Sequence, residues 1–144
     1  MTMENNKPYA LVFGIAIYDI FGFSYATYRP YDSNPGKVKV SCGGVCRNIA
    51  ENMSLVGTNT QFISILGDDE KGKDILRQAE KVGLDMSNTL IIHGGSTPTY
   101  MAILDENGEM VSAVVDTKLA NEFSKEALSE RASIIENAEY MFLG

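Results

Sequence analysis

The chain has 144 residues, of which 44% are hydrophobic and 22% charged, and its formal net charge is −7. This length suits one domain with a sizeable core, and the negative charge disfavours nucleic acid polymers and acidic membranes as partners. No apolar run approaches the roughly 20 residues of a transmembrane helix. The N-terminal segment lacks the basic start and apolar core of a signal peptide, so we expect a cytoplasmic protein.

The cysteines and the histidine do not form a metal-binding pattern. Cys42 and Cys46 lie four positions apart with no second group of ligands nearby, and His93 is the single histidine. A structural zinc site needs about four ligands. We therefore expect no bound metal, two reduced thiols as in cytoplasmic proteins, and a loop histidine without a partner.

Strand and helix patterns alternate from the N-terminus. The apolar run Tyr9–Ala16 is typical of a strand buried on both faces of a parallel sheet. Lys37–Ser41 alternates polar and apolar residues, which predicts a strand with one dry face carrying Val38 and Val40.

A helix is then predicted over residues 45–56, with Gly57 placed to end it. The apolar residues that recur at helical spacing are Val45, Ile49, Met53 and Val56.

The same alternation continues into the middle of the chain. Residues 60–66 are predicted to form a second buried strand, and Gly67 and two aspartates lead into a predicted helix over 70–82. Asp68 and Asp69 are expected to cap that helix. The apolar residues expected to face inward are Ile75, Leu76, Ala79 and Val82. With a short strand at Leu90–Ile92, this order predicts an α/β fold with a parallel sheet.

The pattern changes after residue 95. Thr99–Leu104 and residues 109–115 are extended runs separated by a turn that contains Asn107 and Gly108, the strongest short signal of a β-hairpin. A helix is predicted over about 124–137, and the last residues, 140–144, are typical of a core strand.

Two kinds of sheet are therefore expected. A parallel core flanked by helices would occupy about 8–16, 43–95 and 117–144, and a small antiparallel lid about 18–41 and 97–116. Such a lid would stand over the carboxyl edge of the parallel strands, where ligands bind in open α/β sheets. A chain that ends on a core strand leaves a bare edge, so we expect more chain to follow.

Four polar or glycine positions could form a binding site at this edge. Gly43 and Gly44 precede a helix start, where close backbone approach and free N–H groups favour a ligand, although a tight turn would use the same residues. Asn48 falls on the first helical turn and could bond a hydroxyl or simply face solvent. Asp19 follows the first strand and could accept two sugar hydroxyls or serve as a turn residue.

These positions also form one connected pattern. Residues 43–50 (GGVCRNIA), then Gly57 and then 67–72 (GDDEKG, as G-x-D-x-x-G) resemble the N-terminal signature of the PfkB carbohydrate kinase family. The resemblance implies a ribokinase-like fold and covers residues 1–144 as the N-terminal part of the kinase domain. The C-terminal half of the fold is then absent.

Two segments resemble the pseudouridine kinase branch of that family, namely 31–39 (YDSNPGKVK) and 104–110 (LDENGEM). The resemblance implies ATP- and Mg²⁺-dependent phosphorylation of the 5′-hydroxyl of pseudouridine. Asp19 would then hold ribose hydroxyls, and Gly43, Gly44 and Asn48 would line the sugar pocket. The lid would also serve as a homodimer surface, and its candidate contact residues are Val38, Val40, Thr99 and Tyr100.

The chain departs from the family pattern in three places. Cys46 replaces a small residue, Ile17 stands where many members have Asn, and no G-A-G-D element with its base and anion hole is present. No catalytic residue is therefore expected in this chain, nor ATP or Mg²⁺ bound by it alone, and it should be inactive by itself. Two alternatives stay open: another acceptor such as ribose, adenosine or a hexose, and a non-catalytic binding or dimerisation module.

Overall fold

The computed structural model describes residues 7–144. The order of its strands, helices and one 3-10 helix (η1) is β1 (Ala10–Phe13), β2 (Ile17–Ser24), β3 (Gly36–Gly43), α1 (Val45–Leu55), β4 (Thr60–Ile63), β5 (Ile65–Gly67), α2 (Glu70–Lys81), β6 (Leu90–Ile92), β7 (Thr99–Leu104), β8 (Met110–Asp116), η1 (Lys118–Glu122), α3 (Lys125–Ser129), α4 (Ala132–Glu136) and β9 (Tyr140–Leu143). None of these helices is long and apolar enough to cross a membrane.

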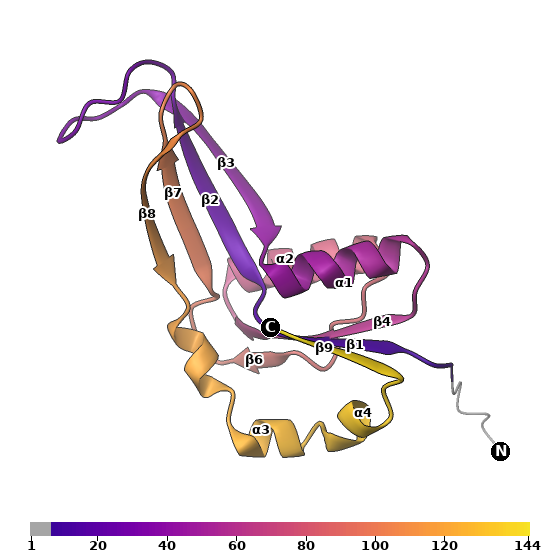
Figure 1. The fold of residues 1–144 in the computed structure, drawn as a ribbon. Helices are drawn as coiled ribbons and strands as arrows, with labels where there is room; N and C mark the ends of the chain where they lie inside the picture. Colours follow the sequence, from indigo (N-terminus) through magenta and orange to yellow (C-terminus); the bar gives the residue numbers. More distant parts are fainter. Residues whose placement is uncertain (1–6) are drawn as a thin grey trace.

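The core sheet is parallel, as predicted. Strand β1 lies at its centre between β4 and β9, and Ala10 is opposite Thr60 on one side and Tyr140 on the other. Figure 1 shows α1 and α2 on one side of these strands and α3 and α4 on the other. The apolar run of β1 is buried because helices cover both faces of the strand.

The single strand expected over 60–66 is two strands. β4 pairs with β1, whereas β5 leaves that sheet and pairs in parallel with β6. Ser64 separates them, and its buried hydroxyl accepts a hydrogen bond from the Ala16 amide at 2.8 Å. A buried backbone donor must find an acceptor, and this serine supplies it where the sheet divides.

Helix α1 forms where expected, but not all of the apolar residues at helical spacing face the core. Val45 and Val56 are 76% and 82% exposed, whereas Cys46, Arg47 and Ala50 are buried. Small side chains at 46 and 50 let the helix approach β1 closely, so these positions face inward together with Met53. Helix α2 follows its pattern, with Ile75 and Ala79 buried.

The lid is a four-stranded sheet in the order β3-β2-β7-β8 that projects from the core (Figure 1). Its outer pairs are antiparallel, but β2 and β7 run parallel, which corrects the expected antiparallel lid. Both inner strands leave the core side by side, so they share one direction. The predicted hairpin is confirmed: Gly108 adopts φ 82°, and Asp105 accepts hydrogen bonds from two turn amides.

The single helix expected over 124–137 is two short helices, α3 and α4. Arg131 lies between them, and its side chain donates to the Asn88 carbonyl at 2.6 Å and the Ala127 carbonyl at 2.9 Å. These hydrogen bonds hold the junction between α3 and α4 against the core. The expected core strand at the end of the chain, β9, pairs with β1, but its side chains are exposed.

Candidate functional site

Asp19 lies inside the lid strand β2, not in a loop after the first strand, because β1 already ends at Phe13. Its neighbours across the sheet are Ser41 of β3 and Tyr100 of β7. The carboxylate therefore stands at the root of the lid, where the lid meets the core.

The glycine pair allows this carboxylate to approach the start of α1. A β-carbon at position 43 would overlap Asp19 Oδ2. Gly44 adopts φ 95°, and a β-carbon there would lie 2.6 Å from the Ile15 carbonyl oxygen. Both positions thus need glycine for packing, and the structure brings Asp19, Gly43 and Gly44 together.

Asn48 joins this cluster through the helix backbone. It lies on the first turn of α1, where its amide donates to the Gly44 carbonyl at 2.9 Å. The residue is exposed, so its side-chain amide is accessible. The four polar and glycine positions predicted from the sequence are therefore neighbours around the junction of β2, β3 and α1.

A buried arginine that the sequence analysis did not single out sets the electrostatics of this junction. Arg47 is 4% exposed, donates to the Cys42 carbonyl at 2.8 Å and to Glu51 at 2.7 Å, and its Nε has no partner among residues 7–144. Burial raises the pKa of the Asp19 carboxyl, and the Arg47 charge opposes that shift. The position of Arg47 inside the GGVCRNIA motif could have marked it as a site residue.

The face of the lid that carries Asp19 is aromatic. Strand pleating places Asp19, Phe21 and Tyr100 on one face. The Phe21 ring lies 6.0 Å from that of Tyr100 and 6.4 Å from that of Phe23. The two phenylalanines were not predicted as site residues, although they alternate with Asp19 in the segment IYDIFGFS, which places all three on one face of a strand.

The other three lid candidates lie on the opposite face. Val38 and Val40 of β3 pair with Gly22 and Ile20, and Thr99 of β7 pairs with Tyr18, so all alternate away from Asp19. Of the lid residues predicted to contact substrate, only Tyr100 shares a face with Asp19.

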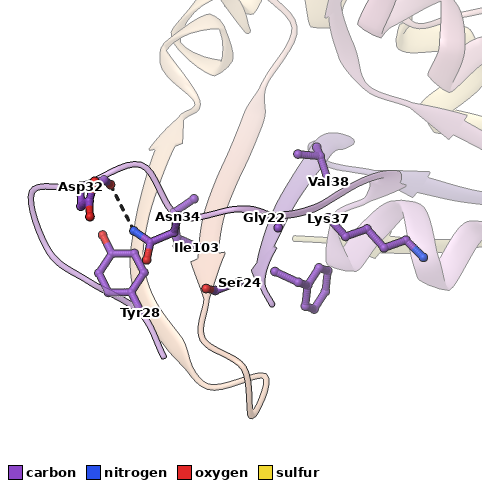
Figure 2. Close-up of a pocket in the computed structure, with 10 residues that line it drawn as sticks. Gly22, Ser24, Tyr28, Asp32, Asn34, Lys37, Val38 and Ile103 are labelled. Carbon is purple, nitrogen blue, oxygen red and sulfur yellow. Dashed lines mark hydrogen bonds between the residues drawn. The ribbon is translucent and has the colours of Figure 1, made fainter. Parts of the chain in front are cut away.

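A cavity of about 290 Å³ lies at the far end of the lid, away from Asp19. Figure 2 shows Tyr28, Asp32 and Asn34 around it, and the Asn34 amide donates to the Asp32 carbonyl at 3.1 Å. Further bonds at 2.8 Å join Asn34 to the backbone of Arg29. The Asn34 side chain therefore organises the loop between β2 and β3.

His93 has a partner, which corrects the expectation of an isolated loop histidine. Its Nδ1 lies 2.7 Å from Asp68 Oδ2, and the Gly94 amide donates to Asp68 Oδ1 at 2.9 Å. The hydrogen bonds with His93 and from Gly94 lower the pKa of the Asp68 carboxyl. Asp69 caps α2 as predicted by accepting from the Gly72 amide. The expectation that Asp68 also caps this helix is wrong, because Asp68 instead closes the loop after β6.

Cys46 does not point toward the glycine pair. Its thiol is buried in the core cluster, and a β-carbon at Gly14 would overlap it, while one at Gly144 would lie 2.5 Å away. Two glycines therefore make room for the bulkier side chain. Burial raises the pKa of both thiols, and both cysteines are free.

No group of three or more histidine, cysteine or carboxylate side chains gathers into a possible metal site within residues 7–144. The residues of this site do not fit a magnesium ion. Their donors and acceptors fit a polar organic molecule: a carboxylate, an accessible amide and an aromatic face.

Comparison with known proteins decides the family. The model of the pfkB family carbohydrate kinases matches residues 7–144. The chain belongs to this family. Pseudouridine kinase of Escherichia coli K12 is 36% identical over 133 residues, which is 92% of this PfkB chain and 42% of the relative.

Similarity to solved structures agrees with this family assignment. A Clostridium perfringens protein classed as a sugar kinase is 58% identical with a TM-score of 0.88 over 94% of this chain and 43% of that one. Arabidopsis thaliana ribokinase, solved with ribose and ATP, is 21% identical with a TM-score of 0.77 over 94% of this chain and 45% of that one, which shows the fold alone. The predicted ribokinase-like fold is confirmed, and the PfkB chain spans about two fifths of the curated relative's length.

Proposed function

We propose that the full-length protein is a nucleoside kinase that transfers a phosphoryl group from ATP to a ribose hydroxyl, with pseudouridine as the preferred acceptor. This chain would supply the acceptor-binding and lid portion. One observation carries the proposal: Asp19 and Tyr100 are direct neighbours on one face of the lid, beside Phe21. A carboxylate for sugar hydroxyls and an aromatic surface for a base are thus adjacent.

The two parts of this face suit the two parts of a nucleoside. A carboxylate accepts hydrogen bonds from two neighbouring hydroxyls, and such charge-assisted bonds contribute about 1.5–3 kcal/mol each. An aromatic side chain that stacks on a base contributes about 1–3 kcal/mol. Free ribose would use Asp19 but leave Phe21 and Tyr100 without a role, which favours a nucleoside.

The roles of this chain in the reaction follow from its residues. Phosphoryl transfer depends mainly on positioning and charge stabilisation. Asp19 would orient the ribose, Asn48 and the glycine pair would bound the sugar, and the lid would exclude water. ATP with Mg²⁺ would supply the phosphoryl group. The acceptor hydroxyl would lose its proton to a base outside residues 7–144, and we therefore propose that this chain alone has no kinase activity.

We propose pseudouridine rather than another nucleoside on two grounds. The segments 31–39 and 104–110 resemble pseudouridine kinases, and the chain is 36% identical to a pseudouridine kinase. Pseudouridine carries an additional ring N–H in comparison with uridine. A site that accepts a hydrogen bond from this N–H rejects uridine, because its acceptor is left unpaired.

The proposal extends to assembly and location. The lid presents exposed apolar side chains, among them Val38, Val40 and Val114, which supports a homodimer formed through the lid. The two free, buried cysteines accord with a cytoplasmic protein.

The test is a coupled assay of the full-length protein and of this 144-residue chain with pseudouridine, uridine, ribose and adenosine. We expect turnover of pseudouridine by the full-length protein alone. Equal use of uridine would reject the pseudouridine assignment, and preference for ribose would reject the nucleoside class. Activity in the short chain would reject its proposed dependence on an external base.

A further inference from the structure

The G-x-D-x-x-G motif at 67–72 contacts the lid, not the candidate site. A β-carbon at Gly67 would overlap the Gly95 carbonyl, and one at Gly72 would lie 2.9 Å from Thr97 Oγ1. Both glycines therefore allow the start of α2 to press against residues 95–97, which lead into the lid strand β7. Close packing of this kind requires glycine where any side chain would intrude.

Asp69 fastens this contact with both carboxylate oxygens. Oδ1 accepts from the Gly72 amide at 2.9 Å and from the Thr97 hydroxyl at 2.5 Å, while Oδ2 accepts from the Thr97 amide at 3.0 Å. Thr97 is fully buried, and its hydroxyl also accepts from the Gly67 amide at 3.0 Å. Burial of Asp69 alone would raise its pKa, but these hydrogen bonds and Lys71 lower it.

Two more residues of α2 hold the roots of both inner lid strands. Lys71 Nζ donates to Thr99 Oγ1 of β7 at 2.7 Å, and Tyr18 of β2 donates its hydroxyl to Asp74 Oδ2 at 3.2 Å. Tyr18 and Thr99 are direct partners in the parallel pair. Helix α2 therefore forms hydrogen bonds to both inner lid strands at the same pair of residues.

The two lid residues that bond to α2, Tyr18 and Thr99, are next in sequence to the site residues Asp19 and Tyr100. Because side chains alternate along a strand, Asp19 and Tyr100 lie on the opposite face of the lid from Tyr18 and Thr99. We propose that Asp69, Lys71 and Asp74 are positioning residues: together with Thr97 they form a clamp that fixes the lid root and so holds Asp19 and Tyr100 over the acceptor. The kinetic part of this inference rests on the proposed function.

The first test compares variants of the full-length protein. Asp69→Asn keeps the helix cap, because Asn also caps well, but it replaces one acceptor facing Thr97. Thr97→Val removes the hydroxyl, and Thr97→Ser keeps it. We expect Asp69→Asn and Thr97→Val to raise the acceptor KM about tenfold, the cost of one charge-assisted hydrogen bond. The KM for ATP should be unchanged, and Thr97→Ser should behave like the wild type.

A matched pair on the same helix separates the clamp from general effects of charge. Lys71→Met removes the bond to Thr99, whereas Lys73→Met removes a bond of the same length to Glu70 on the exposed surface of α2. Only Lys71→Met should raise the acceptor KM. Equal effects of the two changes, or a parallel fall in kcat with every substrate, would overturn the clamp in favour of simple destabilisation.

Amide hydrogen exchange provides a readout that needs no substrate. Asp69→Asn should speed exchange in β2 and β7 several-fold and leave β1 and β4 unchanged. Uniform acceleration, or none, would overturn the clamp. If exchange responds as expected but the wild type turns over no nucleoside, the clamp stands and the proposed function fails.

Discussion

The α/β core and the lid differ in how their residues are held. In the core, Leu11 and Phe62 are completely buried and helices cover both faces of β1. In the lid, β8 is exposed along its whole length and β3 along most of it. Yet Asp19, Phe21 and Tyr100 all lie on the lid. The proposed acceptor contacts thus belong to the region whose strands are more exposed.

The largest expected effect distinguishes the two regions by stability. Phe62→Ala in the full-length protein should lower the free energy of unfolding by about 3–5 kcal/mol, because a buried aromatic ring leaves a cavity. Val115→Ala in the lid, where the side chain is 57% exposed and lies on the face opposite the proposed dimer contact, should change it by less than about 0.5 kcal/mol. Urea denaturation measures both, and similar losses would show that the lid is packed as tightly as the core.

The next effect distinguishes the regions by function. Asp19→Asn should lower kcat/KM for the acceptor about ten- to hundredfold, since a charge-assisted hydrogen bond contributes about 1.5–3 kcal/mol. The KM for ATP should not change. Steady-state kinetics with each substrate varied in turn provide the measurement, and unchanged acceptor kinetics would remove Asp19 from the site.

The same substitution should increase stability. Burial raises the pKa of Asp19, so the folded state binds its proton more tightly than the unfolded chain. Stability then falls as the pH rises from the unfolded pKa through the raised folded pKa. Above this window Asp19→Asn should raise Tm, and below it the difference should vanish. Thermal melts of both proteins from pH 3 to pH 8 test the sign, and a lowered Tm at neutral pH would contradict it.

Self-association should depend on one row of apolar residues across the lid. Val40, Ile20, Met101 and Val114 are successive partners on the face opposite Asp19. Val114→Lys would put a charge into a contact made by this row and should weaken a dimer at least about tenfold, about 1.4 kcal/mol. Val115→Lys, on the Asp19 face, is the control. Sedimentation equilibrium measures both, and a wild-type monomer at micromolar concentration would reject the lid dimer.

The smallest effect concerns the loop after β6. Because hydrogen bonds lower the pKa of Asp68, its contribution to stability is present above the unfolded pKa and is lost as the pH falls through the lowered folded pKa. Asp68→Asn should therefore lower Tm slightly at neutral pH and have no effect in strong acid. Thermal melts across that pH range measure the difference in Tm. A difference that persists in strong acid would show that Asp68 stabilises the loop by packing and not by its charge.

Much of the fold could be predicted because its signals are local. The spacing of Ile75 and Ala79 placed α2, and Asn107 with Gly108 placed the hairpin. The buried face of α1 could not be predicted, because Cys46 and Ala50 face inward through their small size while Val45 remains exposed. Ser64 divides one apolar run into two strands through a hydrogen bond to Ala16, 48 residues away in sequence.

The sequence by itself determined the family and the alternation of strands and helices in the core, because these depend on periodicity and on a motif with fixed spacings. It also predicted that Asp19, Gly43, Gly44 and Asn48 lie close together. Tertiary structure decided which face each residue occupies. It placed Tyr100 beside Asp19 and Thr99 on the opposite face, and it joined Asp69 to Thr97 across 28 residues. Strand register and helix orientation are fixed only when distant segments pack, and no local pattern contains them.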